Sequence, residues 1–278
     1  MRLVKPWKTV NPAVRARLAR LLPPLLFLGA AIGVWYVVST VVLDPERQFL
    51  FPPPHDVVRV GYLDGDNRAE LLDGLWHSAE VASLGLGAAT AAGLLLAVLM
   101  SQARWLERSL FPYLVVLQAT PILALVPLFG FWFEYGFGTR VLVCALIALF
   151  PVVASTLFGL RSVDGAHHDL FTLHGAGRAV RLWKLQLPAA LPSIFTGLRI
   201  SAGLSVIGAI VGDFFFRQGE PGIGVLIDRY QSRLQSEQLL AAVILSSLFG
   251  LAVFWLFGAL ARWVVGGWHE SAREPGAL

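Results

Sequence analysis

Six apolar blocks of about 20 residues each, separated by short charged stretches, most strongly constrain what this chain can fold into. A helix of about 20 residues spans the roughly 30 Å of hydrocarbon in a bilayer. Only 14% of the 278 residues are charged, whereas about a quarter are charged in a soluble domain. The sequence therefore predicts an all-α, polytopic membrane protein with about six transmembrane helices. We place the spans at 24–43, 77–101, 109–132, 140–160, 194–216 and 239–265.

The first block, 24–43, follows a basic segment at residues 1–23. A signal peptide also begins with basic residues, but its apolar region is only about 7–15 residues long and ends at a small-residue cleavage site. The block here is longer and has no obvious cleavage site. We therefore interpret it as a retained first helix.

Basic residues are distributed unevenly between two sets of loops. One set holds 14 lysines and arginines, at 1–23, 102–108, 161–193, Arg262 and the tail after 265. The other holds 7, at 44–76, 133–140 and 217–238. Because basic loops remain on the cytoplasmic side, this pattern predicts that both termini are cytoplasmic. The predicted organisation is a basic cytoplasmic segment, 1–23, a transmembrane domain, 24–265, and a cytoplasmic tail, 266–278.

Small residues recur at helical spacing in several spans. They include Gly29 and Gly33, Gly208 and Gly212, and the run from Gly85 to Gly93. Small side chains allow membrane helices to approach closely. The pattern predicts helix packing within one bundle or, alternatively, an interface between subunits.

The predicted inner loop 161–193 is longer than a simple connection requires. Its first half predicts a short helix that stops at Gly175, since glycine readily takes a positive φ. Its second half places basic residues three apart on one face of another short helix, which Pro188 is expected to close: Arg178, Arg181 and Lys184. Such a hairpin suits docking of a cytoplasmic partner, or contact with lipid headgroups. The residues alone leave both open.

This loop resembles the EAA loop of ABC importer permeases, whose pattern is Glu-Ala-Ala, three residues, Gly, nine residues and Ile-x-Leu-Pro. Here Gly175 is followed by nine residues and then by Leu185-Gln186-Leu187-Pro188. The Glu-Ala-Ala positions hold other residues, of which only the first keeps the acidic character. The resemblance implies that the ATPase-coupling residues are Asp169, Leu170, Phe171, Leu173, Gly175, Arg178, Leu187 and Pro188.

Other segments are similar to the nitrate/sulfonate/taurine branch of these permeases. They are Phe51 to Val57, the Pro-rich stretch Gln118 to Leu128, Gly136 to Gly138, Ala189 to Arg199 and Gly222 to Ile227. Their order and spacing extend the resemblance from about residue 49 to residue 265. The implied fold is that of a type I ABC importer.

The resemblance implies the membrane-spanning subunit of an importer in a bacterial plasma membrane. Its expected partners are membrane lipid, a second copy of itself, a cytoplasmic ABC ATPase dimer and an extracytoplasmic substrate-binding protein at 44–76 and 217–238. A P-loop needs a Gly-Lys pair to wrap phosphates, and the chain contains none. We therefore expect no enzyme activity and no cofactor in this chain, with ATP bound by the partner subunit. Nucleic acid is not expected as a partner, since no basic segment is long enough to follow a phosphate backbone.

Four residues are candidates for the translocation pathway. Asp213 and Glu80 are acids near the outer ends of predicted spans, where they face either the pathway or water. Phe131 and Trp132 could stack on a flat substrate or face lipid. Arg199 is interpreted as reaching toward headgroups rather than forming an inner gate.

Substrate and rival functions are less constrained. The branch transports sulfonate-, nitrate- or taurine-like anions and aromatic vitamin precursors, and the Phe run in 212–216 favours an aromatic solute. A secondary transporter driven by an ion gradient would need charged pairs near the midplane and internal repeats, and the sequence indicates neither. A membrane enzyme would need clustered catalytic side chains. The loop histidines His167, His168 and His174 are interpreted as surface groups, not as a metal site.

Overall fold

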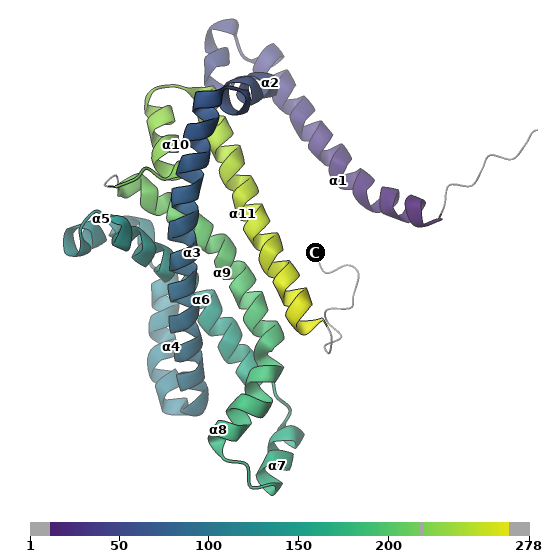
Figure 1. The fold of residues 1–278 in the computed structure, drawn as a ribbon, viewed down its shortest axis with the longest axis vertical. Helices are drawn as coiled ribbons and strands as arrows, with labels where there is room; N and C mark the ends of the chain where they lie inside the picture. The colour runs from purple at the N-terminus through teal and green to yellow at the C-terminus, as the bar shows by residue number, and fades with distance from the viewer. Residues whose placement is uncertain (1–11, 217–218, 267–278) are drawn as a thin grey trace, which may run out of the picture.

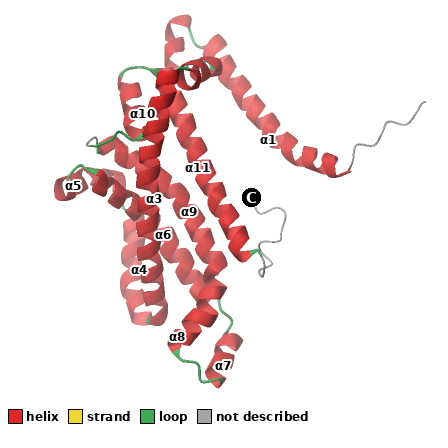
Figure 2. Ribbon diagram, viewed as in Figure 1, coloured by secondary structure: helices red, strands yellow, loops and turns green. Residues whose placement is uncertain are grey.

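The computed structural model describes residues 12–216 and 219–266, and within these ranges the chain is helical with no strand (Figure 2). The N-terminal segment before Pro12 and the tail after Gly266 lie outside the described residues. The helices are α1 (Pro12–Val37), α2 (Pro54–Val57), α3 (Gly65–Gln102), α4 (Arg104–Ala119), α5 (Ile122–Phe133), α6 (Phe137–Arg161), α7 (Gly165–Leu173), α8 (Arg178–Arg181), α9 (Leu187–Phe215), α10 (Ile223–Ser232) and α11 (Ser236–Val265).

Among the described residues, five helices are long and apolar enough to cross a membrane, and a bent pair makes a sixth. The five are Leu21–Val42, Gly65–Gln102, Phe137–Arg161, Arg178–Phe215 and Ser236–Val265. This confirms the predicted all-α membrane protein with about six spans. The second helix is longer than predicted, because α3 extends over 38 residues, about 57 Å at the usual rise of an α-helix.

The third predicted span, 109–132, is not one continuous helix. It is divided between α4 and α5, which are bent by 101°. Thr120 is extended, with a ψ of 131°, and Pro121 follows it. The ring of a proline disfavours the helical conformation of the preceding residue, so the helix ends there. As a result α5 turns away from the bundle axis (Figure 1).

The core of the bundle is the contact of α6 with α3 and α9 (Figure 1). A Cβ atom at Gly85 would overlap Cys144 of α6, and a Cβ at Gly208 would lie 2.9 Å from the Cα of Cys144. Small residues on α3 and α9 therefore pack within one bundle, as predicted. Gly29 and Gly33 differ, since no described residue lies within 4 Å of a Cβ built there, and α1 extends away from the other helices (Figure 1).

The prediction that Pro188 closes a short helix is wrong. α8 continues through a π-helical turn, Leu182–Gln186, into α9, and the helix is uninterrupted from Arg178 to Phe215. The backbone N–H of Leu187 donates to the carbonyl of Leu182, five residues earlier. A wide turn of this kind suits a proline, whose ring would clash with the carbonyl four residues before it in a regular helix.

Candidate functional site

The helix α7 has defined capping at both ends. At its start, the Oδ1 of Asp164 accepts a hydrogen bond from the N–H of Ala166 at 3.2 Å. At its end, Gly175 has a φ of +66°, its N–H donates to Thr172, and the next N–H, of Ala176, donates to Phe171, both at 2.9 Å. This pair of bonds with a left-handed residue is the Schellman C-cap. The predicted helix stop at Gly175 is confirmed.

The hairpin of α7 and α8 projects beyond the end of the bundle (Figure 1). Asp169, Leu170 and Leu173 are exposed, and the side chain of Leu173 is 85% exposed. Phe171 is half-buried, and Arg178 begins α8 in an exposed position. The structure thus brings these predicted coupling residues together on one projecting element. Leu187 and Pro188 lie at its base, at the start of α9.

Asp213 is fully buried, in contrast to the sequence interpretation that left contact with water open. Its Oδ2 accepts a hydrogen bond from Ser78 Oγ at 2.6 Å, and its Oδ1 lies 3.2 Å from Arg140 Nη1. The side chains of Arg140 and Asp213 are 2% and 0% exposed. The sequence indicated no such acid–base pair, but this one joins the first turn of α6 to the last turn of α9, away from the middle of either helix.

The loop before α10 closes over this ion pair. The N–H of Ile223 donates to Ser78 Oγ at 2.8 Å, and Arg140 Nη1 donates to the carbonyl of Glu220 at 3.0 Å. A Cβ at Gly222 would overlap the carboxylate of Asp213, and one at Gly224 would lie 2.7 Å from the Cβ of Asp213. Glycine at both positions therefore allows the backbone to reach the buried acid.

Sequence reasoning selected Asp213 but missed Arg140 and Ser78. Arg140 was assigned to an outer loop because it precedes an apolar block. Its partner is 73 positions away in the chain, and Ser78 is 135 positions from the same carboxylate. The signal in the sequence is an acid that is costly to bury in a membrane, Asp213, followed nine positions later by Gly-Ile-Gly at 222–224. The pathway role of Asp213 stays a prediction, and its contacts hold four elements together.

Glu80 lies on a different face of α3 from Ser78, since two residues correspond to about 200° around a helix. Its carboxylate is 3.5 Å from His77 Nδ1. It lines a cavity of about 500 Å³ together with Trp76, Ser83 and Phe137, among other residues. Glu80 and Asp213 are therefore not brought together, and only Glu80 faces an open space.

The aromatic candidates Phe131 and Trp132 are exposed on α5. Phe131 makes an edge-to-face contact with Tyr135, with ring centroids 6.0 Å apart, and Tyr135 in turn lies 5.7 Å from Phe216. Phe216 itself is fully buried against Val126 and other core residues. The last residue of the Phe run is therefore a core residue and not a candidate for stacking on a substrate, and the preference for an aromatic solute stays a prediction.

Arg199 packs inside the bundle rather than reaching toward headgroups. Its guanidinium carbon lies 3.8 Å from the ring centroid of Phe254 on α11, a cation–π geometry. Gly258, one turn further along α11, leaves room for the same side chain, since a Cβ there would lie 3.4 Å from the guanidinium. This contact stabilises the packing of α9 on α11.

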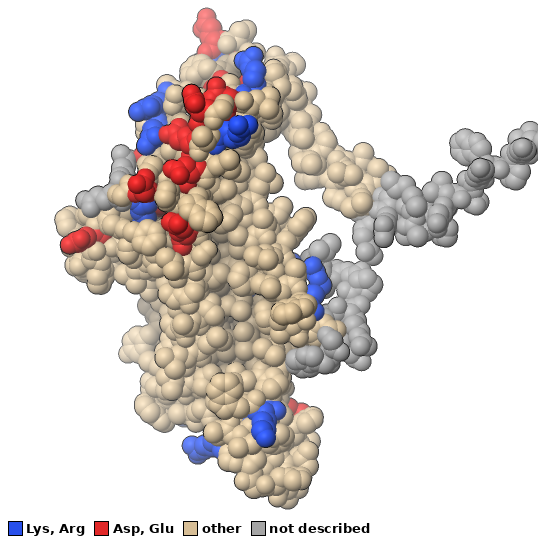
Figure 3. Space-filling view, in the orientation of Figure 1, with Lys and Arg blue, Asp and Glu red and all other residues tan. Residues whose placement is uncertain are grey.

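The predicted outer segments 44–76 and 217–238 meet at one end of the molecule. Arg229 Nη1 lies 2.6 Å from Glu70 Oε1, and the hydroxyl of Tyr230 donates to Glu70 Oε2 at 2.7 Å. Burial, and then the Glu70 carboxylate, raise the pKa of Tyr230 above its usual value. Charged side chains of both signs gather at this end, near α2 and α10, while the long middle of the face in view has almost no charge (Figure 3).

Comparison with known proteins identifies the family to which the chain belongs. The model of the family described as "Binding-protein-dependent transport system inner membrane component" matches residues 89–266. The chain belongs to this family. A probable ABC transporter permease of Haemophilus influenzae is 34% identical over 239 residues, which cover 84% of this chain and 93% of that protein. The formylaminopyrimidine transport permease ThiX of Halalkalibacterium halodurans is 30% identical over 238 residues, covering 84% and 90%.

The fold of this ABC transporter permease is also that of a solved transporter. A crystal structure of an amino acid ABC transporter with histidines matches with a TM-score of 0.58 and 20% identity, covering 71% of this chain and 95% of that one. The chain is therefore a multi-pass protein of the bacterial inner membrane and an importer permease for small solutes. As a permease subunit it is not itself an enzyme.

Proposed function

We propose that this permease couples ATP hydrolysis to import through the segment 161–193, by docking the α7–α8 hairpin into a cytoplasmic ABC ATPase. The observation that supports this most directly is the projecting α7, which exposes Leu170 and Leu173 to the exterior. An isolated, capped helix with exposed leucines is suited to fill an apolar groove in a partner. The basic residues of the same loop favour its location inside the cell.

The proposed transporter contains two copies of the permease, each supplying half of the pathway, together with an ATPase dimer. Closure of the ATPase dimer would move the two hairpins together and open the pathway to the outside. A binding protein would deliver solute at 44–76 and 217–238, two segments that the Glu70–Arg229 ion pair connects. Glu80, beside a cavity near this end, and the exposed Phe131 and Trp132 are proposed to line the pathway.

For the substrate we propose a small heterocyclic solute, related to vitamin precursors. The support is the relatives named for formylaminopyrimidine, at 30% identity, and for riboflavin, at 34% identity over 60% of this chain. Relatives named for aliphatic sulfonates and taurine are 28–30% identical. The binding protein that co-purifies with the permease should melt at a higher temperature with an aminopyrimidine or a flavin. If taurine raises the melting temperature of the binding protein instead, the substrate is a sulfonate and the heterocycle proposal is wrong.

The coupling proposal is tested by gentle purification of the tagged permease from its native membrane. An ATPase subunit should co-purify stoichiometrically with the wild type and be lost in Leu173→Ser. The matched control is Leu63→Ser, because Leu63 is 71% exposed but lies in the predicted outer segment. A permease that purifies alone under several mild detergents would count against the proposal. Proton-coupled uptake by that lone permease would then support a gradient-driven transporter.

A further inference from the structure

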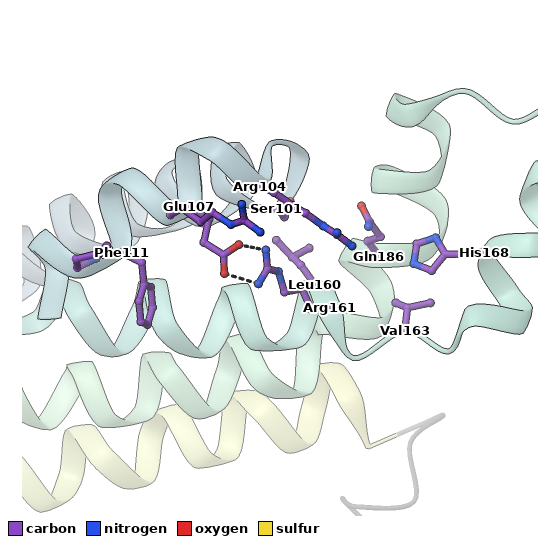
Figure 4. Close-up of a pocket in the computed structure, with 11 residues that line it drawn as sticks. Ser101, Arg104, Glu107, Phe111, Leu160, Arg161, Val163, His168 and Gln186 are labelled. Atoms are coloured by element: carbon purple, nitrogen blue, oxygen red, sulfur yellow. Dashed lines mark hydrogen bonds and ion pairs between the residues drawn. The ribbon is translucent and has the colours of Figure 1, made fainter.

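A second cavity, of about 900 Å³, lies at the end of the bundle that bears α7 (Figure 4). It is formed where α3 ends, α4 begins and α6 ends. Arg104, Glu107 and Arg161 converge there from α4 and α6. His168 and Gln186 lie beside them and belong to the segment 161–193, which is called the coupling segment below. The basic-residue pattern predicts that this end is cytoplasmic.

The cavity has an excess of positive charge. Its lining contains three arginines, Arg104, Arg108 and Arg161, and a single carboxylate, Glu107. Arg161 donates to both carboxylate oxygens of Glu107. Within the described parts of the chain, neither Arg104 nor Arg108 has a carboxylate at ion-pair distance. Two guanidinium groups are therefore available to an anion, and planar guanidinium donors match the geometry of phosphate oxygens.

One wall of the same cavity is apolar. Phe111, Pro112 and Leu160 form part of the lining. On α4, Trp105 and Tyr113 are 70% and 73% exposed. Exposed Trp and Tyr side chains gather at membrane interfaces. A cationic rim beside an apolar wall at the membrane interface suits a phosphate group with attached acyl chains better than a free phosphate ion.

We propose that this cavity binds the phosphate of an anionic phospholipid, with Arg104 and Arg108 as its principal ligands. Basic pockets between helices at the cytoplasmic surface hold such headgroups. Val163 and His168 belong to the coupling segment and line the cavity together with residues of α4. A bound headgroup would therefore connect α7 to α4, and anionic lipid would steady the hairpin. The binding site itself does not depend on the proposed coupling function.

The test is native mass spectrometry of the purified full-length permease, titrated with phosphatidylglycerol or phosphatidylcholine. We expect retained phosphatidylglycerol and little phosphatidylcholine. In the double variant R104Q/R108Q the affinity should fall roughly 30-fold, from the usual contribution of two basic side chains at an anionic lipid surface. The matched control is K184Q/R262Q, which removes two exposed charges of the same predicted inner side without altering the cavity. An equal loss in both double variants would overturn the proposal.

Two further measurements distinguish a lipid from a free phosphate and from a protein as the group that the cavity binds. Inorganic phosphate or glycerol phosphate that binds as tightly as phosphatidylglycerol, and is lost in R104Q/R108Q, would keep the anion site but reject the lipid. Loss of the ATPase subunit from R104Q/R108Q with unchanged lipid binding would show that the arginines dock a protein, and would also overturn the proposal. Failure of the L173S test leaves this result unaffected, so the two proposals fail independently.

Discussion

The two ends of the helix bundle use glycine for opposite reasons. At one end, Gly222 and Gly224 are needed for space, because a side chain at either would collide with Asp213 or its neighbours. At the other end, Gly175 is surrounded by open space and is needed for its φ of +66°. The first end is therefore closed around a buried ion pair, whereas the second presents a capped hairpin. One sequence can thus combine a tightly packed closure at one end with a projecting helical hairpin at the other.

The difference predicts that mutations at the two ends should have separable effects. Those around Asp213 should lower the stability of the bundle, and those around Gly175 should alter coupling with little effect on the bundle. A single probe can report on the bundle, because the chain's only cysteine, Cys144, is fully buried at the contact of α3, α6 and α9. A thiol-reactive dye reacts with it only when these helices separate, so thermal melting can be followed in detergent.

The largest effect is expected for Asp213→Ala. Removing one partner of a buried ion pair takes the balancing carboxylate away from Arg140, at a cost of about 3–5 kcal/mol. The dye should then reach Cys144 at a much lower temperature than in the wild type. Asp213→Asn keeps an oxygen that can accept hydrogen bonds, so its melting temperature should lie between those of Asp213→Ala and the wild type. A melting curve for Asp213→Ala that superimposes on the wild type would show that the network does not hold this end together.

Gly224→Ala should have the next largest effect. The added methyl group would overlap the carbonyl of Ile210 and lie 2.7 Å from the Cβ of Asp213, and overpacking of this kind costs about 1–3 kcal/mol. The dye assay should show a lower melting temperature. Gly203→Ala is the control on α9, where no atom of the described residues lies within 4 Å of an added Cβ. Equal melting of the two variants would contradict the close packing at Gly224.

Gly175→Val should have a smaller and different effect. Among the described residues no atom lies within 4 Å of a Cβ added at Gly175, but a left-handed conformation costs a residue with a Cβ roughly 1–2 kcal/mol. The hairpin should lose its cap while Cys144 remains protected and membrane insertion is unchanged. In vesicles that contain the complete transporter, ATP hydrolysis should continue with little uptake. Wild-type uptake by this variant would weigh heavily against coupling through the hairpin.

The smallest effect is expected for Gly177→Val, two residues further along the same hairpin. Gly177 has a φ of −69°, and within the described parts of the chain no atom lies within 4 Å of an added Cβ. The substitution should change stability by less than about 0.5 kcal/mol and should leave uptake intact. Comparing it with Gly175→Val separates the effect of backbone strain from the effect of added bulk. Equal loss of uptake in both variants would assign the effect to bulk.

Much of the fold could be predicted because span length and polarity are properties of continuous segments. The predicted block 140–160 lies within α6, Phe137–Arg161, and 239–265 lies within α11, Ser236–Val265. The bend at Thr120–Pro121 was not predicted, since membrane helices often contain proline and tolerate it. Pro112 and Pro151 do lie inside α4 and α6. Which proline ends a helix depends on whether neighbouring groups satisfy the released carbonyls.

The candidate sites divide in the same way. The stop at Gly175 follows from local backbone chemistry, and the sequence located it. The pairing of Asp213 with Arg140 joins segments 73 positions apart. Ile223, between Gly222 and Gly224, is hydrogen-bonded to Ser78, which is 145 positions away in the chain. The cavity at Arg104 and Arg108 likewise needs the ends of three helices to meet.

By itself, the sequence determined that this chain spans a membrane and how many apolar segments it has, and it predicts which loop is the coupling element. These follow from hydrophobic length, charge and the conformational freedom of single residues, which act over a few neighbouring positions. Only the tertiary structure decided that Asp213 is sealed within an ion pair, that α5 leaves the bundle and that two arginines face a shared cavity. The reason is physical, because ion pairing, close packing and cavity shape depend on distances between segments that one-dimensional spacing does not contain.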